Sequence, residues 1–161
     1  MTKDEILDAL EDEREKFLEA IEGLPNEALE EPGVVGEWSV KDIIFHVSMW
    51  EAELVKLLWQ AEQGGEPTSL LIADISIDET NTPWHEQSRT RSLDQVLEDF
   101  AGVRKQTQRR VRAILEKNFD DPGCYPWLGG SPLWKWIAED SFGHEAEHVA
   151  QIKEWRERRG V

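Results

Sequence analysis

Hydrophobic residues recur every three or four positions along four long segments of the chain, which is the spacing of one face of an α-helix. The segments cover about residues 3–23, 39–63, 92–118 and 131–159. Each begins with a Ser or Thr in a position that caps helices. No stretch alternates hydrophobic and polar residues for long enough to form a strand. The pattern therefore predicts an all-α protein with four main helices.

The longest connection, residues 64–91, lies between the second and third predicted helices. Its length lets the third helix return across the bundle, rather than form a simple hairpin with the second helix. Within it, Leu70 to Ile77 is apolar and is expected to be a short extended or helical connector. A second irregular segment covers residues 119–130. Neither segment is long or polar enough to separate two domains, so we expect a single domain over residues 1–161.

The charge balance is strongly acidic, with 18 Lys and Arg against 34 Asp and Glu and a net charge of −16. The acidic residues are spread over every segment and do not form a tail. A phosphate backbone would be repelled by such a surface, and an anionic membrane surface would be repelled for the same reason. The composition therefore predicts that neither nucleic acid nor a membrane is a partner.

The chain carries no sequence signal for export or membrane insertion. No apolar run is long enough to cross a bilayer, and the first residues lack the basic start and apolar stretch of a signal peptide. The single cysteine, Cys124, excludes an internal disulfide. We therefore expect a cytoplasmic protein.

Three of the four histidines lie on the inward stripes of predicted helices. His144 and His148 are four residues apart, so their imidazoles share one helix face and can converge on one cation. His46 occupies an inward position of the second helix, where a hydrophobic residue is the usual choice. The pattern favours a metal site with three histidine ligands. The alternative is a buried histidine pair that is hydrogen-bonded to carboxylates.

Four further residues have side chains that could bind a metal or take part in catalysis. Glu145 and Glu147 flank the histidine pair and could orient an imidazole or act as a general base, although a solvated acidic helix face is the simpler interpretation. His85 is expected to be a loop histidine and not a fourth ligand. Aspartates next to Cys124 would raise the pKa of its thiol, which argues against a nucleophilic role.

Two segments, residues 37–51 and 143–152, resemble the DinB-like four-helix bundle superfamily. In that superfamily a Trp-Ser turn, here Trp38-Ser39, opens the second helix, and a histidine follows about one turn later. The last helix carries two further histidines at a spacing of four. The match covers nearly the whole chain in the order of its elements.

The resemblance implies an up-and-down four-helix bundle with a long crossover connection between helices 2 and 3. It also implies that His46, His144 and His148 bind a divalent transition metal, often nickel or zinc. Members of the superfamily include transferases and isomerases that depend on a low-molecular-weight thiol, namely mycothiol, bacillithiol or glutathione. The related ClbS/DfsB group is similar through helices two and three, including residues 81–91.

The segment from His144 to His148 also fits the pattern His-Glu-x-x-His of zinc proteases. Those enzymes need a third ligand further along the chain, often a histidine after a glycine spacer. Here Gln151 occupies the position of that glycine, and Glu154 lies on another side of the same predicted helix. The protease interpretation is therefore disfavoured.

Three neutral imidazoles leave a bound ion with open coordination positions, which is the arrangement of a catalytic site. Such an ion lowers the pKa of a bound water and deprotonates a bound thiol. The first hypothesis is therefore a thiol-dependent transferase that acts on a small-molecule substrate, and the alternative is a metal-dependent hydrolase. A non-catalytic protein that binds a metal or a small molecule is the remaining class. A homodimer is a further hypothesis.

Overall fold

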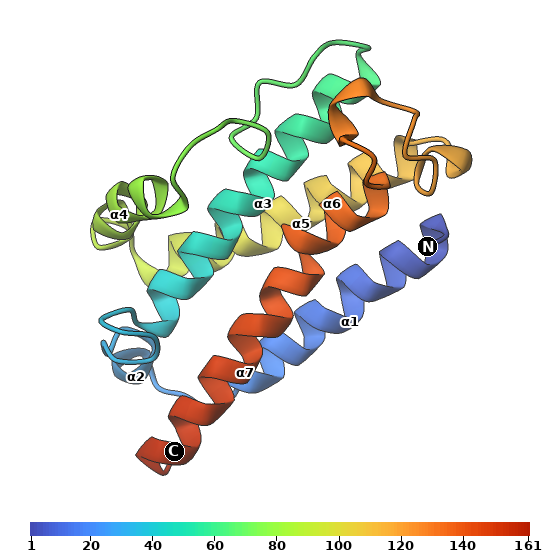
Figure 1. Cartoon of the computed structure of the whole chain (residues 1–161). Coiled ribbons are helices and arrows are strands. Elements are labelled where there is room, and N and C mark those ends of the chain that lie inside the picture. The colour runs from blue at the N-terminus through green and yellow to red at the C-terminus, as the bar shows by residue number, and fades with distance from the viewer.

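The chain folds into a bundle of helices without a β-sheet (Figure 1). The computed structural model describes all residues, 1–161. The all-α prediction is confirmed, and none of the helices combines the length and the hydropathy needed to cross a lipid bilayer. The main helices are α1 (Lys3–Ile21), α3 (Val40–Glu62), α5 (Leu93–Ala113) and α7 (Phe142–Arg159). Shorter elements are α2 (Asn26–Leu29), α4 (Ile77–Ser88), α6 (Leu133–Glu139) and two 3-10 turns, Glu116–Asn118 and Pro126–Leu128.

Three of the predicted helix starts are capping boxes. The side chains of Thr2, Ser39 and Ser92 each accept a hydrogen bond from a backbone N–H in the first turn. The side chain of the residue that supplies this N–H accepts a hydrogen bond from the backbone N–H of the Thr or Ser. This reciprocal arrangement satisfies two backbone donors that would otherwise lack a partner. Local sequence therefore sets the starts of α1, α3 and α5.

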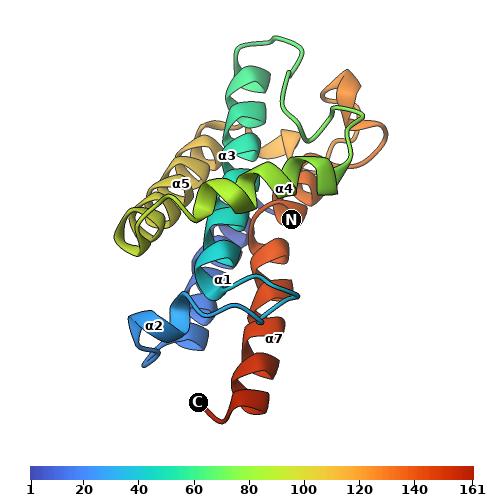
Figure 2. The same ribbon diagram turned by 90° about the vertical axis from the view of Figure 1, so that its left-hand side faces the viewer.

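The long crossover makes α3 and α5 neighbours that run in the same direction, while α1 and α7 run in the opposite direction (Figures 1 and 2). An ion pair of 2.9 Å between Glu62 and Arg110 joins the last turns of α3 and α5. The Lys3 ammonium donates to the Arg112 carbonyl, which joins the start of α1 to the end of α5. The crossover thus places α5 beside α3, and not as its antiparallel hairpin partner.

One helix was not predicted, and one predicted helix is divided in two. The crossover contains a full helix, α4, which packs across α3 (Figure 2). The single helix predicted for residues 131–159 is divided into α6 and α7, because Ser141 has non-helical backbone angles of φ −139° and ψ −104°. Gly143 permits this break, since a Cβ atom there would lie 2.7 Å from the Ala138 carbonyl oxygen.

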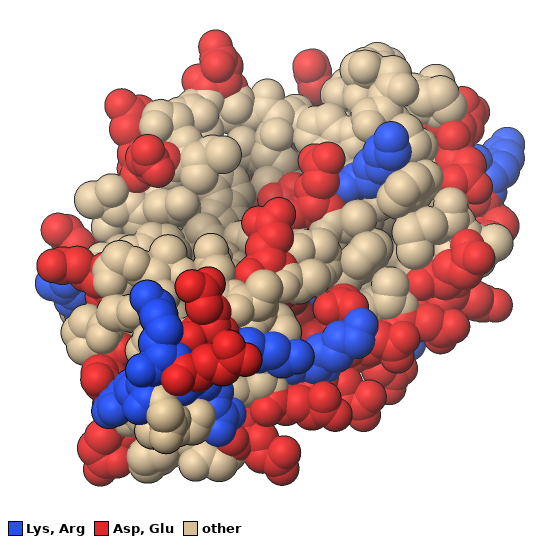
Figure 3. Space-filling model, turned by 60° about the horizontal axis from the view of Figure 1, so that its bottom comes forward, with Lys and Arg blue, Asp and Glu red and all other residues tan.

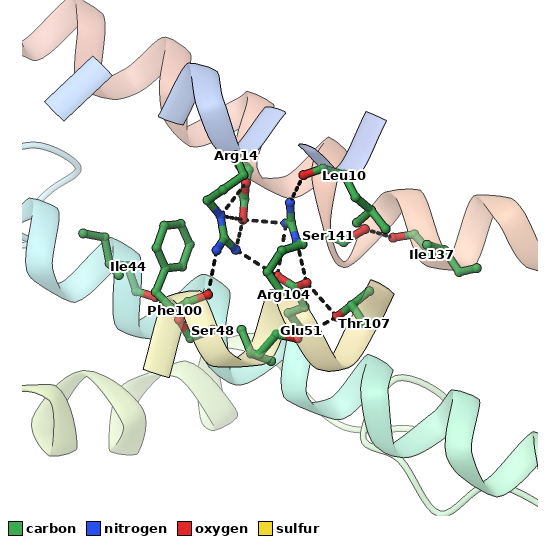
Figure 4. Close-up of polar contacts among 12 residues, drawn as sticks. Leu10, Arg14, Ile44, Ser48, Glu51, Phe100, Arg104, Thr107, Ile137 and Ser141 are labelled. Carbon is green, nitrogen blue, oxygen red and sulfur yellow. Dashed lines mark hydrogen bonds and ion pairs between the residues drawn. The ribbon is translucent and has the colours of Figure 1, made fainter. Parts of the chain in front are cut away.

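The apolar core has two parts, with a layer of charged side chains between them. One part surrounds Phe17, Phe100 and Ile152, and the other surrounds Leu10, Leu54 and Ile137. Each main helix contributes to the intervening polar layer, whose members are Arg14, Glu51, Arg104, Thr107 and Glu145. Figure 4 shows Arg14 and Arg104 extending from α1 and α5 into the same space between the helices.

The polar layer is closely paired. Glu51 and Glu145 are each 1% exposed. The Arg104 guanidinium donates to Glu51 at 2.8 Å and to Glu145 at 2.6 Å, and Arg14 donates to Glu145 at 2.7 Å. The Thr107 hydroxyl donates to Glu51 at 2.7 Å, and Arg104 also donates to a backbone carbonyl of α1. Buried charges are tolerated only when they are paired and hydrogen-bonded in this way.

Removing one carboxylate from this layer is expected to destabilise the bundle strongly. Glu145→Ala leaves two guanidinium groups to share Glu51, so the free energy of unfolding should fall by about 3–5 kcal/mol in urea titrations. The matched control is Glu154→Ala, an exposed acid on the same helix, which should change stability by less than about 0.5 kcal/mol. Equal stability of the two variants would show that the layer does not hold the bundle together.

Candidate functional site

Three histidine side chains meet where α3 faces the start of α7. His46 comes from the second turn of α3, and His144 and His148 come from the first turns of α7. The Nε2 atom of His144 lies 2.9 Å from that of His46 and 3.2 Å from that of His148. The sequence therefore identified all three residues of this cluster, including the member that lies about a hundred residues from the other two.

The spacing of the three Nε2 atoms suits coordination of one cation better than hydrogen bonds between the imidazole rings. A ring nitrogen takes part in one hydrogen bond, so His144 Nε2 cannot satisfy both of its neighbours. Nitrogen ligands at about 2.0–2.1 Å from one ion lie about 2.9–3.4 Å apart in octahedral and tetrahedral sites. Both contacts, 2.9 and 3.2 Å, fall in this range.

Gln151 sets the tautomer of one of these imidazoles. The Nδ1 atom of His148 lies 2.7 Å from Gln151 Oε1, and a carbonyl oxygen only accepts hydrogen bonds, so Nδ1 carries the proton. The Nε2 atom of His148 then keeps its lone pair, which faces His144. The Nδ1 atoms of His46 and His144 are buried without a partner. Sequence analysis missed this role of Gln151, although its position three residues after His148 was the available signal.

Burial keeps the cluster neutral. It is the largest cause that lowers the pKa of His46, to about 4, and of His144, to about 3, and in both cases a charge on a neighbouring histidine adds to the effect. Burial also lowers the pKa of His148. All three imidazoles therefore lose their protons more easily than a free histidine, which is the state that binds a metal.

A cavity of about 460 Å³ opens beside the cluster. Its lining includes apolar side chains from the crossover, among them Leu71 and Ile75, and Trp50 from α3. It also includes three acidic residues, Glu139, Asp140 and Glu147, from the end of α6 and from α7. The volume lies within the range of small-molecule sites, which is about 300–1,000 Å³.

The two candidate glutamates lie in different places. Glu145 points into the polar layer, so the expected solvated helix face is wrong for this residue: it is 1% exposed and holds both Arg14 and Arg104. Glu147 is exposed, as expected, and lines the cavity. The two residues thus face opposite environments although they are separated by a single position.

Sequence analysis missed Asp140, which lines the cavity at the break before α7. Burial and the nearby Glu139 raise the pKa of its carboxyl to about 7. A group with such a pKa can both take up and release a proton at neutral pH. The spacing of Asp140, His144 and His148, four residues apart in each case, was the signal that could have identified it.

The remaining candidates lie outside the cluster. His85 is in α4 and not in a loop, stacks on Trp38 and lies 3.3 Å from Asp42, so it is not a fourth member. Trp38 also packs edge-on against His46 and holds that ring in place. Burial and Asp121 raise the pKa of Cys124, which agrees with the expectation that this thiol is not a nucleophile.

Solved structures of similar fold cover almost the whole chain. DfsB, described as a sibling lethal factor precursor, superimposes with a TM-score of 0.83 at 14% identity and covers 99% of this chain and 97% of its own. ClbS, a colibactin self-resistance protein, gives a TM-score of 0.81 at 10% identity, with coverage of 95% and 94%. An uncharacterised protein from Escherichia coli gives 0.81 at 15% identity, with coverage of 99% and 95%. At these identities the comparison shows the fold alone.

One of these structures corrects an expectation. ClbS was crystallised in complex with dsDNA, so the prediction that nucleic acid is excluded as a partner is wrong. The prediction relied on the net charge, which averages over the whole surface and does not describe any one face. In Figure 3 several basic side chains lie together toward the lower left of the view and others are scattered, while acidic ones are spread over the face. The last turn of α7 alone carries Arg156, Arg158 and Arg159.

Comparison with curated protein sequences gives no significant match. A family model of the DinB superfamily matches residues 9–152, which is most of the chain. The match includes the turn before α3, all three clustered histidines and the crossover between them. The chain therefore belongs to the DinB superfamily.

Proposed function

We propose that the chain is a metal-dependent enzyme that acts on a small molecule, with His46, His144 and His148 as the ligands of one divalent transition metal, nickel or zinc. The observation that carries this proposal is the convergence of three Nε2 atoms, two of them 2.9 and 3.2 Å from the third, at the edge of a cavity. A metal held by three neutral imidazoles keeps open positions and supplies Lewis acidity, together with a lowered pKa for a bound water or thiol.

The surroundings of the histidines favour hydrolysis over thiol transfer. Glutathione and bacillithiol carry carboxylates, whereas the cavity contains three carboxylates and neither Lys nor Arg to pair with them. Hydrolysis also needs a group that moves protons at neutral pH. Asp140 lies in the cavity wall, and in the metal-free chain the pKa of its carboxyl is about 7. We therefore assign Asp140 as the general base that takes a proton from water.

Glu145 and Glu147 have other roles in this proposal. The carboxylate of Glu145 is held by Arg14 and Arg104, so it is not free to accept a proton from a substrate. Glu147 is exposed and lines the cavity, so its negative charge attracts or repels a charged ligand that enters. Transfer of mycothiol, a thiol without a carboxylate, remains the second candidate.

Metal content tests the ligand assignment. After loading with nickel or zinc and dialysis, the protein should retain about one ion per chain, and His46→Ala, His144→Ala and His148→Ala should each retain almost none, because two imidazoles hold an ion weakly. His85→Ala is the matched control and should retain the full amount, since His85 lies outside the cluster. Full metal content in any of the first three variants, measured by elemental analysis, would exclude that residue as a ligand.

The pKa values of the cluster predict how metal affinity depends on pH. Protons compete with the metal only near or below the pKa of a ligand, and burial lowers these values to about 4 for His46 and about 3 for His144. Between pH 7 and 5.5 the affinity should therefore fall by less than about tenfold, whereas three exposed imidazoles would lose roughly 500-fold. Titration with a competing chelator, with a peptide of three exposed histidines as control, distinguishes these outcomes. A loss of several hundredfold in the protein would contradict a buried site.

Hydrolysis of a simple activated ester, p-nitrophenyl acetate, tests the role of Asp140. In the metal-loaded protein Asp140→Asn should lower kcat by about 10²-fold, because it removes the general base, while the metal content stays unchanged. Glu154→Gln is the control and should have no effect. If the ester is not hydrolysed but mycothiol is consumed with an electrophile such as 1-chloro-2,4-dinitrobenzene, the protein is a thiol transferase.

A further inference from the structure

The cavity beside the histidines carries negative charges that no Lys or Arg of the chain compensates. Glu139 and Asp140 end α6, and Glu147 follows on α7, so that all three carboxylates line the same space. None of them forms an ion pair with a Lys or Arg of the chain. The buried carboxylates of the polar layer, by contrast, are paired with two arginines.

Asp140 is the least expected of these groups, because it is partly buried and has no cationic partner. Its raised pKa is the consequence of this burial and of the nearby Glu139. A buried, unpaired carboxylate is unfavourable, and a bound cation would relieve that cost. The chain itself supplies no such cation within the cavity lining.

The wall that the crossover contributes to the cavity is apolar and partly open to solvent. Within it, Ile75 is 39% exposed and Ile77 is 63% exposed. Neighbouring exposed hydrophobic side chains that line a cavity are typical of a site that binds an apolar group. Trp50 extends this wall and is fixed by the hydrogen bond that its indole N–H donates to Asn81 at 2.9 Å.

We propose that the cavity selects an amphiphilic organic cation, such as a protonated amine joined to an apolar body. The ammonium group binds between the carboxylates of Glu139 and Glu147, the apolar body lies against the crossover, and Asp140 stays free to act as the general base. This orientation leaves the end of the cavity with the histidines for the reacting group. The assignment names the substrate class of the proposed enzyme, and it rests on the proposed function only in taking the histidines as the reacting end.

Three probes of similar size and different charge test the assignment: 4-phenylbutylamine, 4-phenylbutanol and 4-phenylbutyrate. Binding is measured by isothermal titration calorimetry at pH 8, with metal-free and metal-loaded protein. In the metal-free protein the amine should bind at least about tenfold more tightly than the alcohol, and the carboxylate most weakly. Added salt should weaken the binding of the amine and leave that of the alcohol unchanged, because salt screens charges.

Two double variants locate the effect. Glu139→Gln/Glu147→Gln should weaken the binding of the amine by about tenfold and leave the alcohol unaffected. Glu154→Gln/Glu157→Gln makes the same change in net charge at exposed positions outside the cavity lining and should alter neither. All four positions are exposed, so both variants should fold like the parent protein.

Several results would overturn the assignment. These are equal affinity for amine and alcohol, equal loss of amine affinity in the two double variants, and no binding of the amine at concentrations up to about 10 mM. The metal-free arm separates this proposal from the proposed function. If no metal is retained but the amine is still preferred, the enzyme proposal fails and the cation cavity stands; if metal is retained and the amine is not preferred, only the substrate class is wrong.

Discussion

The buried ion pairs between Glu145, Arg14, Arg104 and Glu51 set the rotation of α7, and the histidine cluster depends on that rotation. Successive residues of a helix are about 100° apart around its axis, so residues 144 and 148 lie about 100° and 60° from residue 145 in the same direction. With the carboxylate of Glu145 held in the bundle interior, both histidines must face the side on which α3 supplies His46. One buried residue thus orients two others.

The same rotation explains the order of environments around α7. Glu145 faces the interior, His144 and His148 face α3, and Glu147 faces the cavity mouth and solvent. The polar layer also connects the four main helices to one another. It lies between the two apolar parts of the core, which contain no charged residue. Four polar residues within five positions of the sequence therefore lie in three different environments, because they point in different directions around the helix axis.

Sequence was a good guide wherever the signal was local and periodic. Three capping boxes mark helix starts, and the spacing of His144 and His148 with the inward position of His46 identified the cluster. The break at Ser141 was not predicted, because it depends on the close approach of the Ala138 carbonyl to Gly143. The pairing of Glu145 with Arg14 was also missed, since these residues lie 131 positions apart and each looks like a surface charge in its own helix.

Charge gave the least reliable prediction. A net charge of −16 was used to exclude nucleic acid, yet a protein of the same fold was crystallised with dsDNA. The structure shows why the total is a poor guide: some acids are buried in pairs with arginine, some line a cavity without a partner, and basic residues gather at the end of α7. The charge that a ligand meets depends on which acidic and basic side chains lie near it, and this requires the fold.

Nickel affinity in a Glu145→Gln variant shows whether the polar layer orients the histidines. The amide keeps the shape of the side chain but loses the charge that holds both arginines, so α7 should turn more freely. We predict a nickel dissociation constant raised by about tenfold or more, with the helix content of the parent protein by circular dichroism. Glu154→Gln, at an exposed position of the same helix, should bind nickel like the parent. An unchanged dissociation constant in folded Glu145→Gln would show that the ion pairs of Glu145 do not orient the histidines.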